Sequence, residues 1–218
     1  MHEMALPYFF ACPAADPPWP GVVVVHEGNG ISPQLLRVCQ RIAAEGYAAL
    51  APDLFWRFGG SDPGKFLDHL GRIRIEEVRS DLATAVWRLK ELGSSHVGMV
   101  GFCLGGRFTY EAARANLELA CAATFYGAGI AQDLGDLGCP LLAFFGGTDE
   151  YIPAADIQAV QEFHGGDVVV YPEASHGFMR DGSDSYSEAA AADAWNRLLG
   201  FLDDHLKQPT GNPQPRAK

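Results

Sequence analysis

Short apolar runs alternate along this chain with longer segments whose apolar residues recur at helical spacing. The four valines at 22–25 form an unbroken β-branched run, which is typical of a strand buried on both faces. Ser32 and Pro33 then supply an N-cap and a first-turn proline, and the apolar residues after them recur every three or four positions until Gly46. The pattern predicts a buried strand followed by an amphipathic helix.

The same alternation continues to the end of the chain. Further strands are predicted at residues 47–52, 96–100, 120–126, 139–145 and 168–171, and further helices at 78–89, 107–116, 154–163 and 192–206. Two stretches receive no element: an apolar patch at 6–12, followed by a proline-rich connector, and a glycine-rich loop at 53–64. Strands that alternate with helices predict an α/β fold, with a mainly parallel sheet, helices on both faces and right-handed crossovers.

Length and charge narrow the possibilities. The 218 residues are 48% hydrophobic and 20% charged, which is typical of an ordinary globular protein. We expect a single domain over 1–208 and a disordered, polar tail over 209–218. The formal net charge of −11 argues against nucleic acid or an anionic membrane as a partner. No apolar stretch approaches the length of a membrane span, and the first four residues lack the basic region of a secretory signal, so we expect a cytoplasmic protein.

The cysteines, histidines and glycines exclude several kinds of site. The five cysteines are odd in number and scattered, so neither a disulfide framework nor a metal site is expected. The glycine clusters do not fit the dinucleotide-binding pattern, and no cofactor is expected. Small buried hydrophobes are the interpretation of three cysteines, Cys39, Cys121 and Cys139. Surface positions are expected for five histidines, His2, His69, His96, His164 and His205.

One motif carries most of the chemical information. The sequence GFCLGG at 101–106 follows the apolar run at 96–100 and opens a predicted helix. This strand, tight turn and helix is the context of the G-x-S-x-G elbow of α/β-hydrolases, with Cys103 in the serine position. Gly101 and Gly105 would remove side chains that collide with the packing around the strained nucleophile. A lone cysteine is usually a small buried residue, but this context favours a nucleophile.

An acid and a base follow in the order that such a fold requires, nucleophile, acid and then histidine. Asp149 lies just beyond the predicted strand at 139–145, and His176 just beyond the strand at 168–171. All three candidates therefore fall at the carboxyl ends of parallel strands, where open α/β sheets place their sites. His176 could instead be a solvated loop residue. Glu150 and Asp156 are rivals for the acid, but only Asp149 directly follows the Gly-Gly-Thr turn.

These residues would support nucleophilic catalysis. A free thiol has a pKa of about 8.5, and a helix N-terminus or an adjacent base increases its thiolate fraction. His176 would take the proton and Asp149 would fix its tautomer. The oxyanion of the acyl intermediate needs two backbone donors, which we assign to the N–H groups of Leu104 and Gly28.

Taken together, the motifs resemble the dienelactone hydrolase (carboxymethylenebutenolidase) family, the cysteine branch of the α/β-hydrolases. The similarity extends from about Val22 to Leu206, and it rests on the segments 51–55, 101–106, 147–149 and 173–178. The resemblance implies an α/β-hydrolase fold and a triad of Cys103, Asp149 and His176. It also implies that Glu27 contacts the resting cysteine and takes part in thiol activation, although a structural hydrogen bond is the alternative for such a loop carboxylate.

The resemblance further implies that two arginines hold a substrate carboxylate. The matching positions here are Arg57 and Arg180, and a solvated surface arginine is the alternative for either one. Arginine forks pair with carboxylates in bidentate geometry, so two at the expected places favour an anion clamp. The expected walls of the pocket are aromatic, Phe55, Trp56, Phe58, Tyr126 and Phe178.

The leading hypothesis is a cytoplasmic cysteine hydrolase of a small anionic lactone or ester, active as a monomer or a weak homodimer. Dienelactone is the first candidate substrate. The alternatives are a broad esterase or thioesterase and a non-catalytic protein that binds a ligand or senses thiols through the same elbow.

Overall fold

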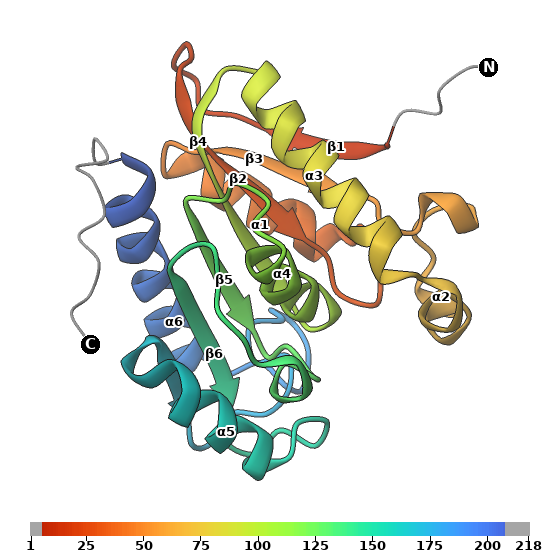
Figure 1. The fold of residues 1–218 in the computed structure, drawn as a ribbon, viewed down its shortest axis with the longest axis vertical. Helices are drawn as coiled ribbons and strands as arrows, with labels where there is room; N and C mark the ends of the chain where they lie inside the picture. The colour runs from red at the N-terminus through yellow and green to blue at the C-terminus, as the bar shows by residue number, and fades with distance from the viewer. Residues whose placement is uncertain (1–5, 208–218) are drawn as a thin grey trace.

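The computed structural model describes residues 6–207, and the strands in this range form one seven-stranded sheet in the order β1-β3-β2-β4-β5-β6-β7 (Figure 1). Only β1 is antiparallel to its neighbour, so the predicted mainly parallel α/β architecture is confirmed. The strands are β1 (Tyr8–Ala11), β2 (Trp19–Val25), β3 (Ala48–Pro52), β4 (Ser94–Phe102), β5 (Cys121–Phe125), β6 (Leu141–Gly146) and β7 (Val168–Tyr171). The predicted tail at 209–218 and His2 lie outside the described residues.

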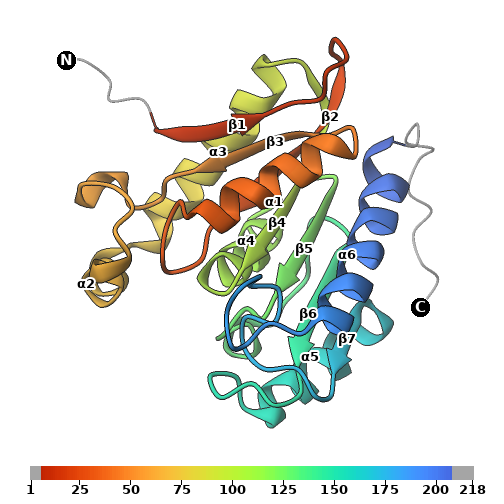
Figure 2. The same ribbon diagram turned by 180° about the vertical axis from the view of Figure 1, so that it is seen from behind.

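Helices cover both faces of the sheet. In Figure 1, α3 and α4 lie on the face toward the viewer, and Figure 2 shows α1 and α6 across the other face. The α-helices are α1 (Pro33–Ala44), α2 (Phe66–Arg72), α3 (Ile75–Glu91), α4 (Leu104–Arg114), α5 (Ala154–His164) and α6 (Glu188–Leu202). Shorter helical turns are η1 (Trp56–Phe58), η2 (Pro63–Lys65), η3 (Ala131–Asp133), η4 (Gly165–Asp167) and the π-helical η5 (Asp203–Lys207). None of the helices within 6–207 combines the length and apolar character of a membrane span.

The valine run of β2 serves both layers of the core. Val23 and Val25 pack in a cluster with the apolar side of α3, whereas Val22 and Val24 belong to the cluster that contains α1 and α6. All four side chains are completely buried. Because successive side chains of a strand point to opposite faces, a centrally placed strand needs apolar residues at every position. This strand and its following helix are therefore confirmed.

The start of α1 follows the predicted capping chemistry. The Ser32 hydroxyl accepts a hydrogen bond from the backbone N–H of Leu35 at 3.2 Å, and Pro33 is the first helical residue. This bond satisfies one of the four N–H groups that have no acceptor inside a helix. Gly46 follows the helix with a φ of +93°, a conformation that favours glycine.

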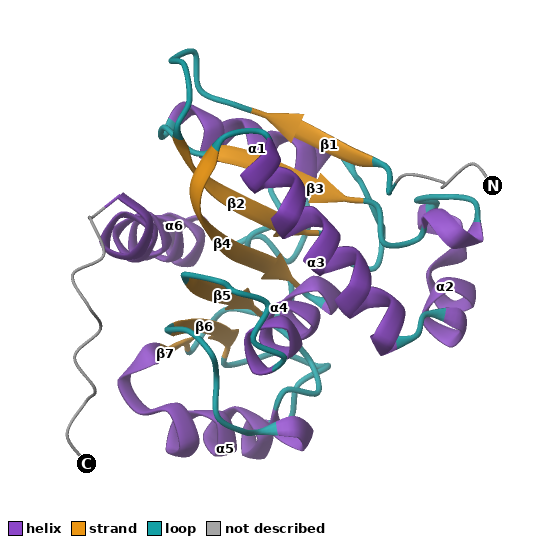
Figure 3. Ribbon diagram, turned by 45° about the horizontal axis from the view of Figure 1, so that its top comes forward, coloured by secondary structure: helices purple, strands orange, loops and turns teal. Residues whose placement is uncertain are grey.

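Among the strands and α-helices described above, β1 and α2 were not predicted. β1 pairs antiparallel with β3 at the edge of the sheet, where the sequence indicated only an apolar patch. α2 lies beside the N-terminal end of α3 at the margin of the molecule (Figure 3). Its His69 contradicts the expectation of a surface histidine, because the ring is completely buried with its centroid 4.4 Å from that of Phe55 and 6.0 Å from that of Phe58.

Candidate active site

The carboxyl ends of four parallel strands bring the candidate residues to one edge of the sheet. Glu27 follows β2, Cys103 follows β4, Asp149 follows β6 and His176 follows β7. This convergence is what the open α/β arrangement predicts, because parallel strands end on the same side.

The turn at Cys103 is tight and strained. Cys103 has φ 54° and ψ −117°, a backbone conformation that non-glycine residues rarely adopt. A Cβ atom at Gly101 would lie 2.0 Å from the carbonyl oxygen of Gly105, and one at Gly105 would lie 2.3 Å from the carbonyl oxygen of Val25. Both glycines are therefore required for strand β4 to pass directly into helix α4. Cys103 is the N-cap of α4, at the positive end of the helix dipole.

His176 is held by a buried carboxylate. Its Nδ1 lies 2.8 Å from Oδ2 of Asp149, whose side chain is completely buried. The other oxygen of Asp149 accepts hydrogen bonds from the backbone N–H groups of Tyr151 and Ile152, at 2.8 and 3.1 Å. Since both carboxylate oxygens are engaged, Asp149 fixes the tautomer and the orientation of the imidazole.

The charge of His176 depends on its two neighbours. Burial lowers the pKa of this imidazole, but hydrogen bonds with Asp149 and Cys103 and the charges of both outweigh burial and raise the pKa to about 9. The ring also packs between two tyrosines, with centroid distances of 5.0 Å to Tyr126 and 4.9 Å to Tyr151. At neutral pH, His176 is therefore an imidazolium held beside the sulfur.

Cys103 and His176 open into a cavity of about 610 Å³. Its walls are Gly28, Asn29, Phe66, Leu70, Cys103, Leu104, Arg107, Ala128, Tyr151, His176 and Arg180. Leu104 is the first residue of α4, so its N–H has no acceptor inside the helix. Gly28 lies against Phe66, whose ring would be 2.2 Å from a Cβ atom at Gly28. The two predicted oxyanion donors thus belong to the same cavity as the sulfur.

Glu27 is connected to the cavity through Arg180. Its Oε2 accepts a hydrogen bond from Nε of Arg180 at 2.8 Å, and its Oε1 accepts one from the hydroxyl of Tyr126 at 3.1 Å. Burial, together with the Glu27 charge, raises the pKa of Tyr126 well above its ordinary value, so this hydroxyl stays protonated and donates. Glu27 is therefore bonded to Arg180 and Tyr126 through both of its carboxylate oxygens.

Comparison with known proteins shows which family the chain belongs to. The sequence profile described as "Dienelactone hydrolase family" matches residues 7–206. The chain belongs to this family. A Salmonella typhimurium protein named "Putative carboxymethylenebutenolidase" is 34% identical over an alignment of 223 residues including gaps. The alignment covers 90% of this chain and 82% of that protein. The Pseudomonas putida "Carboxymethylenebutenolidase" is 30% identical over 210 residues, with 86% and 87% covered.

Solved structures agree as well. The crystal structure of a "Putative Dienelactone Hydrolase" from Klebsiella pneumoniae has a TM-score of 0.81 and 31% identity, and the match covers 90% of this chain and 92% of that one. The family resemblance and the α/β-hydrolase fold predicted from sequence are therefore confirmed, and the protein is a hydrolase of the dienelactone hydrolase type.

In this family member, Arg57 does not reach the cavity. Both terminal nitrogens of Arg57 donate to the carboxylate of Asp81, and Nε1 of Trp56 donates to the same carboxylate at 3.1 Å. These residues line a different cavity of about 600 Å³, beside Tyr8. The Asp81 side chain is only 6% exposed, and a buried carboxylate needs such partners. The expectation that Arg57 and Trp56 contact substrate at the triad therefore has no support in the structure.

Three of the predicted aromatic walls lie behind the cavity. Phe55 is completely buried between His26 and His69, with ring centroids at 4.8 and 4.4 Å. Phe178 is completely buried against Tyr126, at 5.4 Å, and Tyr126 is itself 1% exposed. Tyr126 supports His176 from behind, with ring centroids 5.0 Å apart, and Phe178 supports Tyr126.

Other residues that face the cavity were missed by the sequence analysis. Phe66 and Leu70 lie one turn apart on the unpredicted helix α2, and Tyr151 follows Asp149 by two residues. Arg107 follows Cys103 by four residues, which is the spacing that places two side chains on one face of a helix. That spacing was a usable signal for Arg107, whereas the walls from α2 had none because the helix itself was not predicted.

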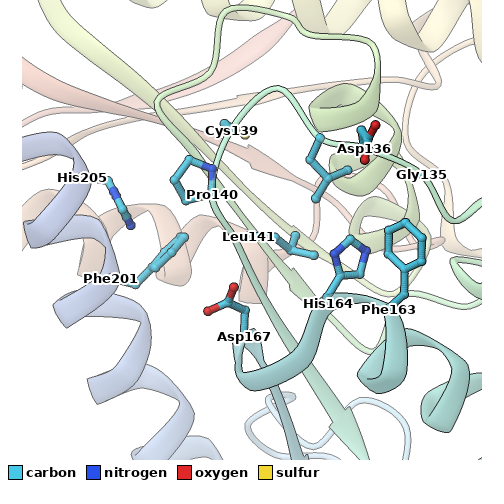
Figure 4. Close-up of a pocket in the computed structure, with 11 residues that line it drawn as sticks. Gly135, Asp136, Cys139, Pro140, Leu141, Phe163, His164, Asp167, Phe201 and His205 are labelled. Atoms are coloured by element: carbon cyan, nitrogen blue, oxygen red, sulfur yellow. The ribbon is translucent and has the colours of Figure 1, made fainter. Parts of the chain in front are cut away.

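A third cavity, of about 450 Å³, is lined by another cysteine and two histidines (Figure 4). It lies where α5, the start of β6 and the C-terminal end of α6 meet, and Cys139, His164 and His205 line it. Burial raises the pKa of Cys139 to about 11, and it lowers the pKa of both histidines. A protonated thiol beside neutral imidazoles is a poor nucleophile, so the Cys103 cavity is the better candidate active site. Cys39 and Cys121 are fully buried as predicted, and Cys139 is half-buried.

Proposed function

We propose that this protein hydrolyses small carboxylic esters or lactones through a thioester on Cys103, and that carboxymethylenebutenolidase activity is its specific reaction. One observation carries the proposal: the buried Asp149 carboxylate lies 2.8 Å from Nδ1 of His176, and this imidazole lines the same cavity as Cys103, whose thiol contributes to the raised pKa of the imidazole. The names of the relatives from Salmonella typhimurium and Pseudomonas putida support this choice of substrate.

The first half of the reaction forms the thioester. The Cys103 thiolate attacks the carbonyl carbon, and the carbonyl oxygen becomes an oxyanion within reach of the N–H groups of Leu104 and Gly28. When the tetrahedral intermediate collapses, the carbon–oxygen bond of the ester breaks. The leaving alkoxide takes the proton from the His176 imidazolium and departs as an alcohol, which stays attached to the acyl chain when the substrate is a lactone.

The second half returns the enzyme to its starting state. His176, now neutral, accepts a proton from a water molecule as that water attacks the thioester carbon. Collapse breaks the carbon–sulfur bond, releases a carboxylic acid and regenerates the thiolate and imidazolium pair. Asp149 stabilises the imidazolium at both stages, and the raised pKa of His176, about 9, is consistent with a proton held close to the sulfur.

Glu27 acts as a positioning residue in this proposal. It holds Arg180 by a 2.8 Å hydrogen bond. Burial lowers the pKa of Arg180, but Glu27 and, to a smaller extent, the Cys103 charge raise it. Arg180 and Cys103 line the same cavity, so Glu27 sets the position of a cation that acts on the reacting sulfur. Displacement of Glu27 by an anionic substrate would change that field.

The test is hydrolysis of dienelactone followed by ultraviolet absorbance, with wild type, Cys103→Ala and Cys103→Ser. Cys139→Ala is the matched control, because it removes the half-buried cysteine that lines the cavity of about 450 Å³. We expect activity in wild type and in the control, and loss of at least about 10³-fold in Cys103→Ala. Mass spectrometry of a rapid quench should find the acyl group on the peptide that contains Cys103. Turnover that survives in Cys103→Ala would reject the mechanism.

A panel of neutral esters and thioesters in the same assay separates the specific reaction from broader ones. Cys103-dependent turnover of the panel without dienelactone hydrolysis would replace the proposed substrate by a broader esterase activity. Alkylation of Cys103 that a ligand prevents, with no turnover of any ester, would favour the binding or thiol-sensing alternative.

A further inference from the structure

The cavity at Cys103 has a charge opposite to that of the chain. The formal net charge of the protein is −11. The residues that line the cavity, all within 6–207, nevertheless include no aspartate or glutamate. They include Arg107, Arg180 and His176, whose pKa of about 9 keeps it protonated at neutral pH. A cationic cavity in an acidic protein selects for anionic molecules.

Each of these cations has a carboxylate partner that is not part of the cavity wall. His176 pairs with Asp149, Arg180 with Glu27, and Arg107 with Asp133. The partners differ in exposure, because the side chain of Glu27 is 16% exposed and that of Asp133 is 41% exposed. Solvent screens an exposed carboxylate more strongly, so Asp133 neutralises Arg107 less than Glu27 neutralises Arg180.

Arg107 is oriented but not saturated. Its Nη1 donates to the carbonyl oxygen of Gly129 and its Nη2 donates to Asp133. Gly129 has a φ of +82°, which favours glycine, and a Cβ atom there would lie 2.1 Å from Nη1 and displace the guanidinium. A guanidinium has five N–H donors, so three remain after these two bonds. Holding the group in place in advance reduces the entropy lost when a ligand binds.

We propose that Arg107 binds a carboxylate of the substrate and makes the enzyme selective for anionic esters or lactones. The inference rests on the proposed function, because it concerns the substrate of the same site. Arg57, which the sequence suggested for this role, is engaged by Asp81 in another cavity. Arg107 follows Cys103 by one helical turn, so a carboxylate on the substrate would bind close to the reacting sulfur.

The test compares two esters of similar size, 4-nitrophenyl hydrogen succinate, which is anionic, and 4-nitrophenyl pentanoate, which is neutral. In Arg107→Gln we expect KM for the anionic ester to rise about 10- to 100-fold, the range for losing a hydrogen bond to a charged group. KM for the neutral ester should stay within about twofold. The kcat/KM of wild type for the anionic ester should also fall with added salt, and that of Arg107→Gln should fall less.

Two variants separate recognition from structure. Arg114→Gln is the matched control, because Arg114 lies on the same helix with nearly the same exposed fraction, 33% against 34%, and is outside the cavity. It should leave both esters unaffected. Asp133→Asn removes the competing carboxylate but keeps Arg107, so KM for the anionic ester should stay the same or fall. A purely structural role of the Arg107 and Asp133 pair predicts that Asp133→Asn harms both esters as Arg107→Gln does.

Binding measurements keep the inference testable when turnover fails. In a Cys103→Ala background, glutaramate and the neutral glutaramide are titrated by nuclear magnetic resonance, with and without Arg107→Gln. Tighter binding of glutaramate than of glutaramide that disappears with Arg107→Gln supports the inference, even when neither ester is hydrolysed. The absence of hydrolysis would reject only the proposed function. Equal effects of Arg107→Gln on both ligands, or a selectivity that depends on Arg57→Gln instead, would overturn the inference and leave Cys103 chemistry intact.

Discussion

Replacing Asp149 by asparagine should lower the pH at which His176 loses its proton. Oδ2 of Asp149 lies 2.8 Å from Nδ1 of His176, and both side chains are buried. Burial alone lowers the pKa of the imidazole, and Asp149 and Cys103 together raise it to about 9. Compared with the ordinary value of 6.5, this rise of 2.5 in pKa favours the imidazolium by about 3.4 kcal/mol.

Without the carboxylate, only Cys103 opposes burial, so we expect the pKa of His176 in Asp149→Asn to fall to about 6.5 or lower. At a pKa of 6.5, the protonated fraction would be about fourfold lower than in wild type at pH 7 and about thirtyfold lower at pH 8. The proposed mechanism needs that proton for the leaving alcohol. The loss of kcat/KM in Asp149→Asn relative to wild type should therefore grow with pH. A misplaced imidazole would add a second loss, which is the same at every pH.

The assay is kcat/KM for ester hydrolysis between pH 6 and 10. A proton resonance titration of His176 in wild type and in Asp149→Asn, both of which keep Cys103, reports the same ionisation directly. Asp156→Asn is the control, since this exposed carboxylate pairs with Gln132 and was the sequence rival for the acid. An alkaline limb at the same pH in Asp149→Asn and wild type would refute the reasoning, because His176 would then owe its proton to other groups.

Three further outcomes are expected. His176 has its ordinary pKa in the unfolded chain, so the stability that its protonated form contributes is complete below about pH 6.5 and is lost as the pH rises through about 9. In urea titrations over this window, the free energy of unfolding of wild type should therefore fall by up to about 3.4 kcal/mol more than that of Asp149→Asn. Gly101→Ala would place a Cβ atom 2.0 Å from a carbonyl oxygen and should cost about 3 kcal/mol or more in thermal unfolding, whereas Gly200→Ala, with nothing within 4 Å in helix α6, should gain about 0.5–1 kcal/mol. Iodoacetamide should label Cys103 in the native protein while Cys39 stays unlabelled by mass spectrometry, because burial raises the pKa of Cys39 to about 12; labelling of both at equal rates would contradict this assignment.

The order of elements could be predicted because it depends on local patterns. An unbroken valine run, the Ser32 cap and the elbow glycines each have one good structural solution, and the sheet then brings Cys103, Asp149 and His176 to the same edge. Strand β1 was not predicted because its pairing partner, β3, lies about 40 residues further along the chain, and one exposed residue followed by three half-buried ones gives little periodicity.

Side-chain direction could not be predicted from the same patterns. Arg57 stands where the family resemblance implied a clamp, but Asp81 on helix α3 binds it, and a contact across 24 residues leaves no local signal. His69 is buried by two phenylalanines from the preceding loop, which is also a tertiary effect. Arg107 is the opposite case, because its spacing of four from Cys103 is local and was available from the sequence.

The cations that line the cavity would reduce an electrostatic repulsion that the proposed reaction creates. An anionic nucleophile and an anionic substrate repel each other, by about 4 kcal/mol at 4 Å in a medium of effective dielectric constant 20. Three cations of the cavity, Arg107, Arg180 and His176, can offset that repulsion because their carboxylate partners are not part of the cavity wall. These partners are Asp133, Glu27 and Asp149. Two of these partners follow parallel strands and were found from sequence. The third, Asp133, lies in helical turn η3, so the proposed selectivity of the cavity depends on a loop conformation that no single motif encodes.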